Sequence, residues 1–81
     1  MIIELQEPFK SKWEKGYLVD DGDGRKRVIF YSSPDKRDGM TYARYLMCVQ
    51  LGYILPTELE VDHKNDNKAD DRIENLQVLT K

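Results

Sequence analysis

The chain shows two kinds of hydrophobic pattern, one with the period of a strand and one with the period of a helix. In its last third, Leu59 and Val61 alternate with Glu58 and Glu60, and the alternation returns over residues 76–79. A period of two is typical of a half-buried strand. The pattern therefore predicts two short strands joined by a long polar loop.

The first half of the chain predicts a β-hairpin. Residues 17–20 and 25–31 flank the run 21–24, whose Asp and Gly residues tolerate the positive φ angles of a tight turn. This acidic run lacks the spacing of an EF-hand loop, so we expect a plain turn. Residues 32–39, with Pro34 and Gly39, are expected to form a linker-like loop.

A single amphipathic helix is predicted after this loop. Thr41 is a suitable N-cap, and Gly52 is a suitable C-cap with Pro56 soon after it. The apolar residues between them recur at helical spacing and are expected to pack on the sheet: Tyr42, Tyr45, Leu46 and Val49.

The N-terminal residues carry weaker signals. The first eight residues fit an edge strand or a frayed arm, and Trp13 lies among Lys10, Lys12 and Lys15. We favour a tryptophan that anchors this arm to the core over a DNA-facing arm, because Trp is usually well buried. The expected organisation is one small α+β domain: an arm (1–15), a hairpin (16–32), a helix (41–52) and a C-terminal motif (58–80).

Composition narrows the class of protein. The net charge of −2 disfavours bulk non-specific affinity for DNA, although the 13 Lys and Arg residues can still cluster on one face. The single Cys48 cannot form an internal disulfide, and a lone Cys with a lone His excludes zinc sites built on Cys pairs. With no signal peptide or long apolar run, we expect an intracellular protein that does not bind membranes.

The candidate chemistry lies where the first C-terminal strand meets the polar loop. His63 is the only histidine and can accept a proton near neutral pH, and the adjacent Asp62 is a hard ligand suited to Mg²⁺ or Mn²⁺. Asn75, at the end of the loop, can tie the loop to the strand and orient the imidazole. Neighbouring strand residues point to opposite faces, so Asp62 and His63 can converge only if the strand breaks there. The polar run from Lys64 favours such a break.

These residues resemble the core of the HNH endonuclease family, in particular its phage and intron-homing branch. The resemblance is carried by Val61-Asp62-His63, Asn65-Asp66 and the run 70–76, with the preceding helix over 42–47 and the segment 52–56. It implies the ββ portion of a ββα-metal motif and metal-dependent hydrolysis (nicking) of DNA. It also implies that Asp62 is the metal ligand, His63 the general base and Asn75 the residue that orients the loop.

One element of the family pattern is missing from the sequence. The second metal ligand of the family is an Asn or His on a helix after the second strand, and the sequence ends at Lys81. The chain could be truncated, could take a ligand from a partner, or could have lost cleavage. The alternative function is therefore a non-catalytic HNH-derived module that binds DNA or a protein. An uncovered second strand would favour a homodimer or a protein partner.

Six cations are candidates for contacts with DNA. Lys64, Lys68 and Arg72 lie in the motif loop, and they could equally be solvated residues that balance its acids. Arg25, Lys26 and Arg27 open the second strand of the hairpin, where they could contact phosphates or protect a charged strand edge.

Overall fold

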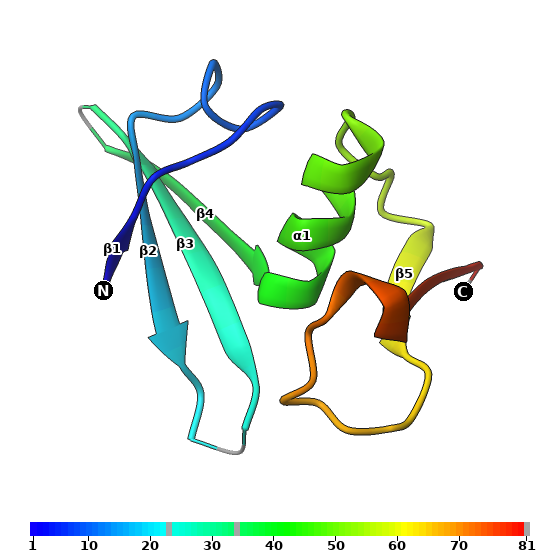
Figure 1. Ribbon diagram of the computed structural model, residues 1–81. Helices are drawn as coiled ribbons and strands as arrows, with labels where there is room; N and C mark the ends of the chain where they lie inside the picture. Colours follow the sequence, from blue (N-terminus) through cyan, green and yellow to red (C-terminus); the bar gives the residue numbers. More distant parts are fainter. Residues whose placement is uncertain (23, 34, 81) are drawn as a thin grey trace.

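The computed structural model describes residues 1–22, 24–33 and 35–80. It confirms the α+β class, with antiparallel strands, one helix and then further strands (Figure 1). Asp23 of the expected turn, Pro34 of the expected linker and Lys81 lie outside the described residues. Within the described ranges, no helix has both the length and the apolar character that a membrane span requires.

The N-terminal half forms a four-stranded antiparallel sheet of order β1-β2-β3-β4, called here the N-terminal sheet. Its strands are β1 (Ile2–Ile3), β2 (Lys15–Asp20), β3 (Lys26–Ser32) and β4 (Lys36–Thr41). The expected hairpin is its centre, where Tyr17 pairs with Ile29.

The expectation of a linker over residues 32–39 was wrong, because β4 occupies its second half and β3 ends at Ser32. Residues 36–38 are exposed, so β4 has no alternating apolar pattern to reveal it. It exists because the backbone of β3 pairs with it from Arg27–Thr41 to Ser32–Lys36. The interpretation of Arg27 as protection for a strand edge was also wrong, because β3 is paired on both sides.

The helix α1 (Tyr42–Leu51) has the expected caps. The Thr41 side chain accepts a hydrogen bond from the Arg44 backbone N–H, and Gly52 has a left-handed φ of 84°. The helix packs against one face of the N-terminal sheet, and Figure 1 shows it between this sheet and β5.

Beyond the helix, β5 (Leu59–His63) and β6 (Leu76–Thr80) form a two-stranded antiparallel sheet, called here the C-terminal sheet. A short 3-10 helix, η1 (Ile73–Asn75), leads into β6. The guanidinium of Arg44 holds the approach to β5 by donating to three carbonyl oxygens, those of Leu59 at 2.7 Å, Leu55 at 2.9 Å and Pro56 at 2.8 Å.

One aromatic core joins the N-terminal segment to the sheet and the helix. Phe9 and Phe30 are almost completely buried and stack with ring centroids 5.0 Å apart. Trp13 stacks on Phe30 at 5.7 Å, so it anchors the N-terminal segment to the core as favoured above. Tyr45 from α1 completes the cluster, and its hydroxyl accepts a hydrogen bond from the Gln6 backbone N–H at 3.0 Å.

Candidate active site

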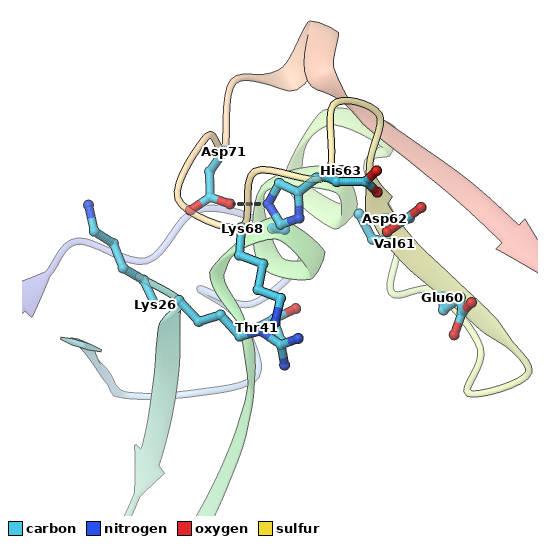
Figure 2. Close-up of a pocket in the computed structure, with 11 residues that line it drawn as sticks. Lys26, Thr41, Glu60, Val61, Asp62, His63, Lys68 and Asp71 are labelled. Carbon is cyan, nitrogen blue, oxygen red and sulfur yellow. Dashed lines mark hydrogen bonds and ion pairs between the residues drawn. The ribbon is translucent and has the colours of Figure 1, made fainter. Parts of the chain in front are cut away.

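A cavity of about 410 Å³ lies between the N-terminal sheet and the C-terminal sheet. The turn between β2 and β3, the start of α1, β5 and the 64–72 loop all contribute to its wall (Figure 2). The turn and the loop approach each other closely, since a methyl group at Gly24 would lie 3.7 Å from Ala69 Cβ. The lining residues are Arg25, Lys26, Thr41, Ala43, Glu60, Val61, Asp62, His63, Asp66, Lys68 and Asp71.

Asp62 and His63 both line this cavity, but they lie on opposite faces of β5. The strand continues to His63, with Asp62 paired to Gln77 and His63 paired to Leu76, so the expected break before His63 is absent. Alternation places His63 on the face of Val61, which packs on the core. Figure 2 shows the imidazole directed toward Asp71 and the Asp62 carboxylate directed away from it.

The imidazole of His63 is held by a carboxylate from the loop. His63 Nε2 lies 2.7 Å from Asp71 Oδ1, and the two side chains are 15% and 11% exposed. An ionised carboxylate can only accept hydrogen bonds, so this contact favours the tautomer with the proton on Nε2. Nδ1 then carries the lone pair and can accept a proton from a water molecule in the cavity.

Asparagine side chains shape the 64–72 loop. Asn65 Oδ1 accepts from the backbone N–H of Asn67 at 2.9 Å, and Asn67 Oδ1 accepts from that of Ala69 at 3.1 Å. The buried Asn75 donates from Nδ2 to Asn65 Oδ1 at 3.0 Å and to the Asp70 carbonyl at 2.9 Å. Asn75 therefore closes the loop, and in the described contacts it holds the residue next to Asp71 instead of the imidazole.

Asp66 and Asp71 do not make the backbone contacts that turn-forming residues make. Asn65 and Asn67 make these contacts instead, while Asp66 adopts a left-handed φ of 62° and lines the cavity. Such a φ is tolerated best by Asp, Asn and Gly.

Arg72 is engaged within the loop. Its guanidinium donates to both carboxylate oxygens of Asp70, from Nε at 2.7 Å and from Nη2 at 2.8 Å, and lies 3.6 Å from Glu74. This fork holds the pKa of the Asp70 carboxyl well below its usual range and raises the pKa of Arg72. Arg72 is thus a loop-shaping residue in this structure, and its predicted contact with DNA remains a prediction.

The other predicted cations divide into two groups. Arg25, Lys26 and Lys68 line the cavity, while Lys64 is exposed at the start of the loop. Arg27 does not line the cavity. Its neighbour Val28 faces the core, so Arg27 faces away from the core.

Asp71 is the site residue that the sequence did not reveal. The motif loop holds several acids, and nothing in its spacing distinguishes the one that reaches back over eight residues to His63. A partial signal existed in the geometry of β5: since Asp62 had to face away from His63, another residue had to orient the imidazole.

The cavity suits a divalent cation only when the substrate supplies part of its coordination. Within residues 1–22, 24–33 and 35–80, no three His, Cys, Asp or Glu side chains gather in a way that could hold a metal. A metal that relies on protein ligands alone therefore does not fit. Mg²⁺ and Mn²⁺ fit better, because Mg²⁺ usually takes one or two carboxylates and completes its shell with phosphate oxygens and water.

Asp62, the carboxylate expected to hold the metal, lines the cavity, and its described hydrogen bond is a long one of 3.5 Å from Gln77 Nε2. The charges of the cavity favour such an ion. Four carboxylates line it against three cations, so a phosphodiester would enter a site of like net charge unless a cation accompanied it.

Comparison with known proteins identifies the segment that holds the site. Residues 42–81 match the family model described as HNH endonuclease. None of the curated proteins and none of the solved structures matches the chain. The matched segment begins at α1 and includes Asp62, His63, Asp71 and Asn75, whereas Arg25 and Lys26 precede it.

Proposed function

Because residues 42–81 of this chain belong to the HNH endonuclease family, we propose that the cavity beside His63 is a nuclease active site that hydrolyses DNA phosphodiester bonds. The observation that carries the proposal is the 2.7 Å contact between His63 Nε2 and Asp71 Oδ1. It supports an imidazole that Asp71 holds through Nε2, so that Nδ1 is left to act as general base in a cavity that also contains Asp62.

In this mechanism His63 removes a proton from a water molecule, and the resulting hydroxide attacks the phosphorus atom. The bond from phosphorus to one ester oxygen breaks, and the departing alkoxide takes a proton from solvent. Asp71 stabilises the imidazolium that forms and keeps the ring in position. Lys68, Arg25 and Lys26 bind the phosphate, which they can do because all three line the same cavity.

HNH endonucleases are generally dependent on divalent metal ions. We propose Mg²⁺ or Mn²⁺ for this chain, with Asp62 as its protein ligand. When bound, the ion would neutralise charge on the phosphate and on the leaving oxygen. Asn75 contributes indirectly, by fixing the loop that carries Asp71.

A plasmid-nicking assay with Mg²⁺, with Mn²⁺ or with EDTA tests this function. His63→Ala should reduce the nicking rate by roughly 10²- to 10⁴-fold, the usual contribution of a general base. Glu58→Ala is a suitable control, because Glu58 is exposed just before β5 and does not belong to the cavity wall. Wild-type nicking by a His63→Ala variant with an unchanged circular dichroism spectrum would contradict the proposal.

The second candidate is an HNH-derived module that binds DNA or a protein without cleaving it. It is favoured by the lack of a three-ligand cluster among the described residues. The same assay separates the two functions when binding is measured beside it. Binding of DNA with no nicking under any metal condition would support the module, whereas metal-dependent nicking that His63→Ala abolishes would support the enzyme.

A further inference from the structure

The face of the N-terminal sheet that points away from α1, called here the outer face, differs in charge from the rest of the chain. Val28 and Phe30 of β3 are buried against the helix, so the alternate residues Arg27, Ile29 and Tyr31 face outward. The strand register extends this face to both neighbours. Tyr31 pairs with Lys15 and Arg37, Ile29 pairs with Tyr17 and Gly39, and Arg27 pairs with Val19 and Thr41.

Every charged residue at these outward strand positions is a cation. Lys15, Arg27 and Arg37 lie there, while the strand carboxylates Asp20 and Asp38 pair with Lys26 and Phe30 and so belong to the opposite face. At one end of the face the loop residues Glu14 and Asp35 share a depression with Lys15 and Arg37. The chain carries a net charge of −2, so this separation concentrates positive charge on one surface.

The three cations are available for a partner. In the ranges that the structure describes, the side chains of Lys15, Arg27 and Arg37 make no hydrogen bond or ion pair. Gly39 lies at the centre of the outer face and has no side chain to fill the space there. A methyl group there would lie 3.4 Å from Arg27 Nη2 and 3.1 Å from Ile29 Cδ1, so the glycine leaves room for the Arg27 side chain.

Aromatic rings lie between these cations. Tyr17 and Tyr31 contact each other edge to face with ring centroids 5.2 Å apart, and Tyr31 is 36% exposed. Neighbouring strands are about 4.8 Å apart, so Lys15 and Arg37 flank Tyr31 at about 10 Å from each other.

The outer face is also continuous with the proposed active site. The basic run that opens β3 passes from the cavity to the outer face, because Arg25 and Lys26 line the cavity and Arg27 points to the other side of the sheet. A second copy of this chain is a poor occupant, since like charges would meet. A polyanion that already lies at Arg25 and Lys26 would reach Arg27 by following the turn between β2 and β3.

We propose that the outer face is a second DNA-contact surface, which binds the duplex that flanks the cleaved bond. Lys15, Arg27 and Arg37 contact its phosphates, and Tyr17 and Tyr31 lie between them against its sugars. The choice of DNA as the partner rests on the proposed function, but the contact itself needs neither a metal nor cleavage.

The test is the affinity for a short fluorescent duplex, measured by anisotropy in EDTA over a series of salt concentrations. Arg27→Ala/Arg37→Ala should weaken binding roughly tenfold for each cation at about 0.1 M salt and should reduce the slope of log K against log salt by about 2. Arg27→Lys/Arg37→Lys should regain most of the affinity, because Lys also neutralises phosphates.

The matched control is Lys10→Ala/Lys12→Ala, which removes the same charge. Both lysines are exposed on the segment that Phe9 and Trp13 anchor against Phe30, on the helix side of the sheet. This control should bind within about threefold of the wild type, as expected for cations that touch no phosphate.

Three results would overturn the proposal. They are an equal loss in both double variants, wild-type affinity in Arg27→Ala/Arg37→Ala, and no binding of the duplex by the wild type. If the wild type nicks DNA while Arg27→Ala/Arg37→Ala binds the duplex normally, the outer-face proposal fails and the proposed nuclease function stands.

Discussion

The role of Asp71 gives the sharpest prediction, because in the proposed mechanism its carboxylate alone orients the imidazole of His63 and stabilises the imidazolium that forms. Asp71→Asn preserves the size of the side chain and removes its negative charge. The contact it weakens is short, 2.7 Å, and joins two side chains that are 15% and 11% exposed. Solvent therefore screens it less than it screens a surface ion pair.

The magnitude follows from the energy of such a bond. A hydrogen bond to a charged group contributes about 1.5–3 kcal/mol, and about 1.36 kcal/mol corresponds to a tenfold change in rate. Asp71→Asn should thus lower the rate of DNA nicking roughly 10- to 200-fold at saturating metal. This loss is smaller than the one expected for His63→Ala, because the imidazole itself remains.

Asp66→Asn is the matched control for this prediction. Asp66 lies in the same loop, lines the same cavity and loses the same charge, but its side chain makes no described contact with His63. Asn tolerates its φ of 62°, so the loop should keep its shape. Asp66→Asn should nick at nearly the wild-type rate.

Two results would refute the reasoning. One is an equal effect of Asp71→Asn and Asp66→Asn, which would mean that the cavity responds to net charge alone. The other is an additive effect in the double variant His63→Ala/Asp71→Asn, because a residue that acts through His63 should add little once His63 is gone.

Two further predictions concern the fold that holds the site. Arg44→Ala should lower the free energy of unfolding by about 2–3 kcal/mol in urea titrations, since three backbone carbonyls lose a charged donor, and Arg44→Lys should recover only part of this because it lacks the planar fork. Burial raises the pKa of Tyr45, so its phenol contributes stability that is full below pH about 10 and declines as the pH rises toward the folded-state pKa. Tyr45→Phe, which leaves the Gln6 N–H without its acceptor, should be less stable than the wild type by about 1 kcal/mol at neutral pH, and urea titrations should show this difference shrinking in alkaline solution. A difference that is constant up to pH about 11 would contradict the assignment.

The sequence predicted the elements whose signal is local. Thr41 and Gly52 marked the ends of the helix, and the alternation around Val61 marked β5. β4 was missed because an exposed edge strand with Lys36, Arg37 and Asp38 has the composition of a loop. Its pairing is provided by the backbone of β3, which composition does not encode.

The site was also predicted only in part, because some of its geometry follows from local sequence and some from the path of the loop. Alternation along a strand correctly separates Asp62 from His63, and it also separates Arg27 from Lys26. The contact between Asp71 and His63 depends on the path of the loop. That path is set by side-chain hydrogen bonds of Asn65 and Asn75, which residue spacing alone does not specify.

The boundaries of the family segment and of the candidate site do not coincide. The match begins at residue 42, yet Arg25 and Lys26 supply two of the three cations that line the cavity. The helix at the start of the matched segment packs through Tyr45 on Phe30, a buried residue of the N-terminal sheet. If the HNH segment acts as a nuclease, its phosphate-binding charge and much of its core therefore come from the strands that precede it. The N-terminal sheet is consequently part of the proposed active site on one face and, in our proposal, part of the DNA-contact surface on the other.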